Sequence, residues 1–97
     1  MLTILRNRKS PADPPKDPGA LALSALAWVL SSEDRAQRLL ALTGLTPDAL
    51  REGLGDSAVL GAVLEFLCSH EPDLLAASEA LGVEPQALAD AAARLTR

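Results

Sequence analysis

The 97-residue chain contains 18 Ala and 20 Leu, but one Trp, one Phe, no Tyr and a single Cys. Ala and Leu are strong helix formers because they lose little or no side-chain freedom in a helix. A sheet favours the β-branched and aromatic residues that are scarce here. The length suits one domain, and the composition predicts an all-α protein. One Cys excludes an intramolecular disulfide.

Charge is distributed unevenly along the chain. The net charge is −4, with a balance of +2 over residues 1–17 and −6 over residues 18–97. Phosphate backbones repel an acidic body, which argues against nucleic acid as a partner. The longest apolar run, Ala20–Leu30, is too short to span a bilayer, and Met1–Lys9 shows no signal-peptide pattern. We therefore expect a cytoplasmic protein.

The N-terminal segment differs from the rest in composition. Residues 10–19 hold four Pro and one Gly, and Pro is incompatible with a helix interior or a central strand. We predict a disordered, Pro-rich arm at residues 1–17, followed by a helical bundle domain at residues 18–97. The basic residues of the arm either attract an acidic partner or only solubilise the terminus, and we favour the second interpretation.

The domain is predicted to be a compact bundle of five to six short helices around a central apolar helix. Capping residues and helix-ending Gly or Pro delimit the segments 18–30, 33–43, 47–52, 57–70, 72–81 and 85–95. In the first segment, Leu23, Leu26 and Leu30 recur at helical spacing, which predicts a common apolar face. The fourth is apolar nearly all round, as expected of a helix in the middle of a bundle.

Small residues on the central helix predict close helix packing. With so few aromatic side chains, Leu and methyl-sized Ala must fill the interior. We therefore expect neighbouring helices to approach closely at Ala58, Gly61 and Ala62.

Two segments 38 residues apart share the pattern Gly, aliphatic, x, Pro, x, Ala, Leu. They are residues 44–50 and 82–88. Gly at the first position is suited to the left-handed conformation that ends a helix, and Pro is favoured in the first turn of the next. The aliphatic residue and the Leu have the spacing of a hydrophobic staple. We predict two helix-turn-helix corners, with positive φ at Gly44 and Gly82.

The second corner also suits a nucleic-acid-binding helix-turn-helix, which is the alternative function. Ser78, Gly82 and Leu88 have the small, turn and buried aliphatic character that such a motif requires. The helix that would enter the major groove offers only Gln86, Asp90 and Arg94. Residues 71–97 contain five acidic residues against two Arg, which argues against DNA recognition.

No catalytic constellation is apparent, and we expect neither enzymatic activity nor a small-molecule substrate. Cys68 and His70 are two residues apart, a spacing that points them to different sides of a helix. We interpret Cys68 as a small buried residue and His70 as favourably placed at a helix C-terminus. One Cys and one His fall short of structural zinc patterns, and no phosphate-binding loop is present. No metal or cofactor is expected.

Two further features are interpreted as structural. Trp28 is expected in the core or half-buried, although Trp also anchors interfaces. Asp34 and Arg38 lie four residues apart, which predicts an ion pair on a solvated helix face.

An interaction or adaptor module, with an unidentified protein partner, is the function that remains by elimination. The candidate partner-binding residues are on and after the short third helix: Asp48, Arg51, Glu52 and Leu54. Leu54 lies between two Gly and has no obvious helical position. Either it is exposed for a partner, or it plugs the end of the bundle. The sequence does not give the oligomeric state.

Three segments carry a resemblance to a known family. Residues 39–51, 59–67 and 70–75 resemble an alphaproteobacterial family catalogued as domain of unknown function 3572. The family pattern is a Phe-Leu-Ala-Leu-Thr-Gly-Leu corner, a Val-Leu-Asp-Phe-Leu helix and an Asp-Glu-x-x-Leu-Leu segment. Leu39 replaces the Phe, Glu65 replaces the first Asp, and His70 replaces the second. The resemblance covers about residues 20–90 and implies a cytoplasmic protein of unknown activity, with no catalytic residue carried over.

Overall fold

The computed structural model describes residues 17–96, which form six α-helices and no strand within that range. The helices are α1 (Pro18–Leu30), α2 (Glu33–Thr43), α3 (Pro47–Glu52), α4 (Ser57–Cys68), α5 (Glu71–Leu81) and α6 (Pro85–Leu95). The predicted all-α class is confirmed. The predicted arm at residues 1–17 lies outside the described residues, apart from Asp17.

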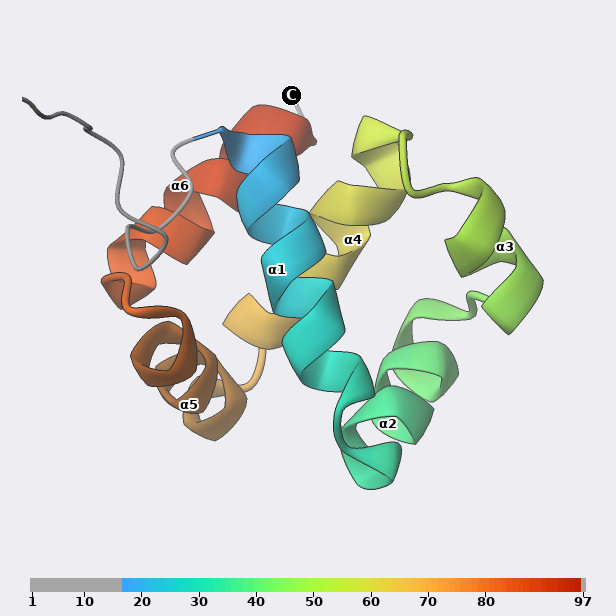
Figure 1. The fold of residues 1–97 in the computed structure, drawn as a ribbon, viewed down its shortest axis with the longest axis horizontal. Coiled ribbons are helices and arrows are strands. Elements are labelled where there is room, and N and C mark those ends of the chain that lie inside the picture. Colours follow the sequence, from blue (N-terminus) through green and yellow to red (C-terminus); the bar gives the residue numbers. More distant parts are fainter. Residues whose placement is uncertain (1–16, 97) are drawn as a thin grey trace, which may run out of the picture.

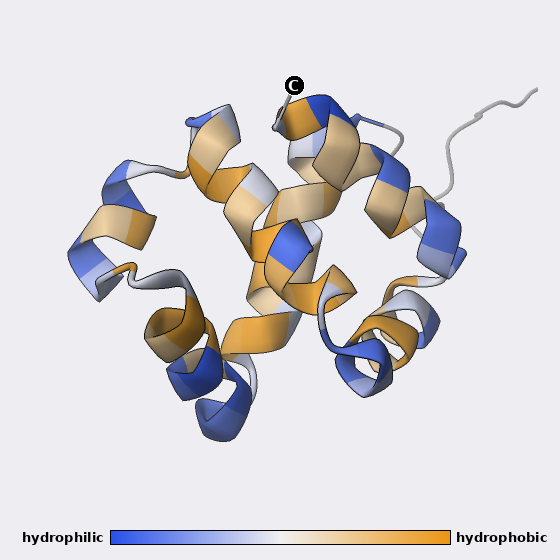
Figure 2. Cartoon of the chain, turned by 180° about the vertical axis from the view of Figure 1, so that it is seen from behind, coloured by the Kyte–Doolittle hydropathy of each residue, from blue (hydrophilic) through white to orange (hydrophobic). Residues whose placement is uncertain are grey.

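Helix α4 is the centre of the bundle, as predicted. It packs against α1, α2, α5 and α6, while the short α3 lies at one edge (Figure 1). Apolar residues are concentrated along α4, and hydrophilic residues gather on the outer turns of the peripheral helices (Figure 2). Glu65 is the exposed side chain in the middle of α4. The largest fully buried side chains come from four helices: Val29, Leu39, Val63, Leu64, Leu67 and Leu88.

Small residues allow close packing at one of the three predicted positions on α4. A Cβ at Gly61 would lie 2.6 Å from Thr96 Cγ2 and 3.3 Å from Leu95 Cβ, so α6 packs directly against the α4 backbone there. Ala62 is half-buried. The prediction is wrong for Ala58, which is exposed because it lies in the first turn of α4, capped by the exposed Asp56.

The helix ends follow local capping rules, with one difference from prediction. Asp17 accepts a hydrogen bond from the backbone N–H of Ala20 at 2.9 Å, and Pro18 occupies the first turn of α1. Helix α4 ends at Cys68, whereas residues up to 70 were predicted to be helical. His70 is extended, with φ −134°, and is the N-cap of α5. Its predicted position at the C-terminus of the central helix is therefore wrong.

The two predicted corners are confirmed. Gly44 and Gly82 have φ of 75° and 71°, in the left-handed region. Leu50 and Leu88, which close the two staples, are buried, and Leu45 and Val83 pack against the core.

Replacing Gly44 or Gly82 with Ala is expected to lower the free energy of unfolding by about 1 kcal/mol each, the order of the left-handed penalty for a residue with a Cβ. A Cβ would meet nothing within 4 Å at either position, so the effect isolates the backbone penalty. Chemical denaturation measures it, and two neutral substitutions would contradict the corner interpretation.

The outward face of α1 differs from prediction. Leu26 is buried, whereas Leu23 is 41% exposed and Leu30 is 50% exposed. The three residues therefore do not share a buried face. Because α1 is apolar on all sides, its sequence pattern did not distinguish the core-facing side from the solvent-facing side. The buried residues of α1 are Leu21, Ala22, Ala25, Leu26 and Val29.

Candidate protein-interaction surface

The predicted partner-binding residues all lie on the exposed edge formed by α3 and the turn after it. Asp48 and Arg51 form an ion pair, with 3.2 Å between Oδ1 and Nη2, and both side chains are largely exposed. Glu52 is exposed, and Leu54 is 42% exposed. Leu54 therefore does not plug the end of the bundle completely. We refer to these four residues as the α3 surface.

Helix α3 is held to the bundle by few groups. The Thr46 hydroxyl caps it by accepting a hydrogen bond from the backbone N–H of Ala49 at 3.0 Å. Leu50 is buried, and Gly53, which ends the helix, is also buried. The charged residues of α3 point into solvent while one Leu anchors it. This arrangement presents the α3 surface on a short helix that one buried Leu anchors.

A shallow groove runs between α2 and α4, the two helices that α3 connects along the chain. Its volume is about 290 Å³. Leu42, at its edge, is 72% exposed, the largest exposed fraction among the large hydrophobic side chains of the described residues. We refer to this feature as the α2–α4 groove. Its lining residues are Leu42, Thr43, Ala62, Glu65, Phe66 and Ser69.

Leu42 is not among the residues predicted to bind a partner, although its position in α2 carries a signal. In α2, Ala36, Leu39, Leu40 and Thr43 turn toward the core and are buried or half-buried. Leu42 does not fit that spacing, so a large aliphatic side chain falls on the outer side of an otherwise amphipathic helix. Such a residue is either a single exposed Leu, which is ordinary, or part of a binding surface. The adjacent groove favours the second interpretation.

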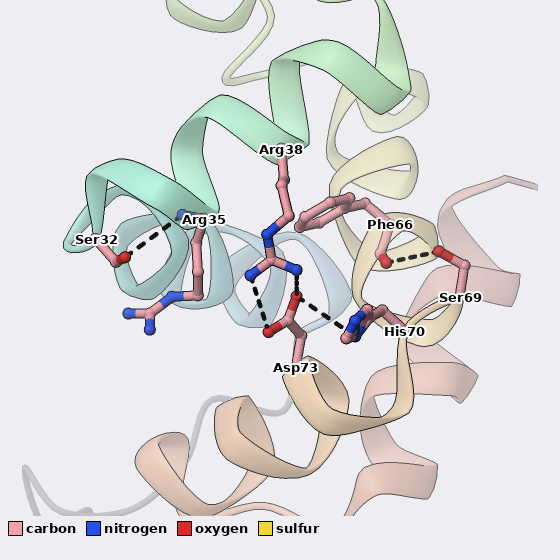
Figure 3. A network of polar contacts seen from close by, with 7 residues as sticks. All are labelled: Ser32, Arg35, Arg38, Phe66, Ser69, His70 and Asp73. Carbon is pink, nitrogen blue, oxygen red and sulfur yellow. Dashed lines mark hydrogen bonds and ion pairs between the residues drawn. The ribbon is translucent and has the colours of Figure 1, made fainter.

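An ion pair between the half-exposed Arg38 and the buried Asp73 joins α2 to α5 (Figure 3). The Arg38 guanidinium donates from Nη1 to Asp73 Oδ2 at 2.8 Å and from Nη2 to Asp73 Oδ1 at 3.3 Å. Asp73 is 8% exposed. The predicted pair between Asp34 and Arg38 is wrong, because the fork of the guanidinium matches the two oxygens of a buried carboxylate on another helix.

The surroundings of His70 and Cys68 have structural explanations. His70 Nδ1 is 3.9 Å from Asp73 Oδ2, so a protonated ring would add to the Arg38–Asp73 pair. Burial, with a smaller contribution from the negative charge of Glu65, raises the pKa of the Cys68 thiol. A reactive thiol needs the opposite shift, because the thiolate is the nucleophile.

Trp28 is half-buried, in agreement with the interpretation as packing, and Arg35 covers its ring. The guanidinium carbon is 3.8 Å from the ring centroid, a cation–π distance. Nη2 also donates to the Trp28 carbonyl at 3.0 Å and to Ser31 Oγ at 3.1 Å. These contacts connect α2 to the C-terminal end of α1 and to the turn between the two helices.

The α5–α6 corner combines a buried interior with a mixed outer face. Ser78 and Leu88 are buried, as the helix-turn-helix pattern requires. On the exposed side, Gln86 Nε2 donates to Asp90 Oδ1 at 2.9 Å. The amide that would read a base edge is therefore held beside a carboxylate.

Residues 17–96 contain neither a metal-binding cluster nor a membrane-spanning helix. No group of three or more His, Cys, Asp or Glu side chains is arranged there to hold a metal ion. The longest of the described helices has 13 residues, and none has the length and apolar character of a membrane span.

The sequence matches one protein family over most of its length. The profile of the family described as "Protein of unknown function (DUF3572)" matches residues 15–97. No curated protein and no solved structure matches the chain. The matched region includes all six helices, the α3 surface and the α2–α4 groove. The chain therefore belongs to the DUF3572 family.

Proposed function

We propose that this protein is a small, non-catalytic protein-interaction module that binds its partner across the α2–α4 groove and the α3 surface. The observation that carries the proposal is Leu42, a large aliphatic side chain 72% exposed at the edge of the groove. When a partner covers an exposed aliphatic group beside a concave surface, apolar area is removed from water and the free energy of the complex falls.

The groove favours a peptide segment over a small molecule. Its volume of about 290 Å³ is at or below the lower limit of pockets that enclose drug-sized ligands. Its lining includes the buried Phe66 and the half-buried Ala62, together with the exposed Glu65. We expect the partner to insert one aliphatic side chain next to a Lys or Arg that pairs with Glu65.

The cellular setting is part of the same proposal. The acidic composition of the chain suits the proposed cytoplasmic location in a bacterium. The raised pKa of the Cys68 thiol supports the absence of nucleophilic catalysis. We propose no cofactor.

Nucleic-acid binding is the second candidate function, and the buried Ser78 and Leu88 of the α5–α6 corner favour it. Against it, α6 contains a single cation, Arg94, and the carboxylate of Asp90 on the same helix offsets its charge. Recovery of specific nucleic acid with the purified protein at moderate salt would replace the present proposal.

Leu42→Asp is expected to abolish specific partner binding while leaving the fold intact, because the side chain makes little contact with the core. The measurement is quantitative affinity capture from the native cell, followed by mixing of the identified partner with purified variants. The combined variant Leu54→Asp/Arg51→Glu tests the α3 surface in the same way.

Leu75→Asp is the matched control. Leu75 is 49% exposed on α5 and does not line the groove, so this variant is expected to retain the partner. Equal retention by all the variants, each shown to be folded by circular dichroism, would remove both surfaces from consideration. Loss in the control as well would indicate nonspecific hydrophobic capture.

A further inference from the structure

The outward face of α1 carries a continuous apolar stripe that no described element covers. Its residues are Ala20, Leu23, Ala27 and Leu30. Ala27 is exposed, the two Leu are 41% and 50% exposed, and Ala20, in the first turn, is half-buried. In Figure 1, α1 lies across the front of the bundle with no helix in front of it. Residues of α1 do not line the α2–α4 groove, so this face is independent of the proposed function.

The spacing of the stripe is that of a helix–helix seam. The intervals between successive members are three, four and three residues, which is the alternation of the a and d positions in a heptad. Ala occupies both a positions and Leu both d positions. A solvent-facing stripe of this kind, on a helix whose other side is already buried, indicates a second helix as its natural neighbour.

Charge indicates which helix that neighbour is. Among the six described helices, α1 alone contains no charged residue, in a chain whose residues 18–97 carry a balance of −6. Two copies of such an acidic body meet with the least electrostatic repulsion through an uncharged face. The residues that flank the seam include Ser24 and Ser31 in place of the charged residues that select a foreign partner in coiled coils.

We propose that α1 is a self-association surface, through which two copies of this chain form an antiparallel, two-fold symmetric pair. In antiparallel register about Ala25, each layer places one Leu against one Ala. Leu23 of one copy faces Ala27 of the other, and Leu30 faces Ala20. Large and small side chains then alternate across the interface, which fills space evenly. A parallel pair would stack Ala on Ala and Leu on Leu.

The interface is small, and its strength follows from its size. A 13-residue helix is about 20 Å long, and one helix face is at the low end of specific protein interfaces. The pair is therefore weak and reversible. Acidic Asp17 and Glu33 flank α1 in the sequence, so repulsion between the copies opposes pairing until salt screens it.

Sedimentation of the full chain between about 10 µM and 1 mM, at low and high NaCl, tests the proposal. The wild type is expected to dimerise, more strongly at high salt. Ala27→Glu is expected to raise the dimer dissociation constant by about tenfold or more, because a carboxylate then faces Leu23 of the other copy and the interface gains two negative charges. Leu75→Glu and Leu42→Asp should dimerise like the wild type. A wild type that remains monomeric throughout, or a dimer unaffected by Ala27→Glu, would overturn the proposal.

Cross-linking tests the orientation. In a Cys68→Ser background, which removes the natural thiol, an equimolar mixture of Leu23→Cys and Ala27→Cys is expected to give mainly the mixed disulfide dimer on mild oxidation. Preferential cross-linking of each variant with itself would show a parallel pair and contradict the proposed register. If the wild type stayed monomeric and Ala27→Glu abolished binding of a different protein, the proposal would be wrong and the α1 face would bind that protein instead.

Discussion

Replacing Arg38 with Met is expected to lower the free energy of unfolding by about 2 kcal/mol, less than the cost of breaking a fully buried ion pair because the Arg38 side chain is 41% exposed. The substitution removes both hydrogen bonds to the Asp73 carboxylate, which is 8% exposed. His70 Nδ1, at 3.9 Å, is too distant to replace them. Urea denaturation measures the loss.

Replacing the other member of the pair, Asp73, should lower the free energy of unfolding by less. In Asp73→Asn the guanidinium of Arg38 loses its partner, but its side chain is 41% exposed and water can solvate it. We expect a loss of about 1 kcal/mol, and a double variant less destabilised than the sum of the two. Additive effects would show that the pair contributes nothing as a pair.

The exposed pair between Asp48 and Arg51 provides the control. Its side chains are 82% and 69% exposed. Arg51→Met is therefore expected to change stability by less than about 0.5 kcal/mol. If Arg51→Met destabilised the protein as much as Arg38→Met, the loss of an Arg would explain both results. The buried carboxylate left without a partner would then not be the cause.

The parts of the fold that sequence predicts well are those fixed by neighbouring residues. Asp17, Thr46 and Asp56 each cap the helix that follows, and Gly44 and Gly82 each end the helix that precedes. Each of these features depends on a few consecutive residues. The helix ends therefore agree closely with the predicted segments, except where Ser69 and His70 separate α4 from α5.

The parts that sequence did not predict depend on which helices meet. Arg38 has a possible partner four residues away at Asp34, and only the arrangement of α2 and α5 in the fold brings it to Asp73 instead. Likewise, α1 is apolar all round, so its periodicity cannot show that Leu23 and Leu30 face outward. For the candidate site, the α3 surface was accessible to sequence reasoning. The α2–α4 groove was not, because it exists only between two packed helices.

Gly53→Ala is expected to lower the free energy of unfolding by about 2 kcal/mol, within the range for overpacking a filled site. The backbone at Gly53 has φ −95°, which Ala tolerates, so the cost is steric. A Cβ would lie 2.6 Å from Val59 Cγ2, 2.9 Å from Val59 Cβ and 2.9 Å from the Ala49 carbonyl oxygen. The last two atoms are at or next to the backbone and cannot rotate away.

Gly55→Ala, two residues further on, is the matched control for this substitution. A Cβ there would meet nothing within 4 Å, and the φ of Gly55 is not in the left-handed region, so stability should be nearly unchanged. In Gly53→Ala, α3 must shift relative to α4, and amide hydrogen exchange over Pro47–Glu52 should accelerate more than in the core of α4. If stability fell without faster exchange in α3, the strain would be relieved at Val59 instead. Because α3 carries the candidate partner residues, a displaced α3 should also weaken partner binding, whereas Gly55→Ala should not.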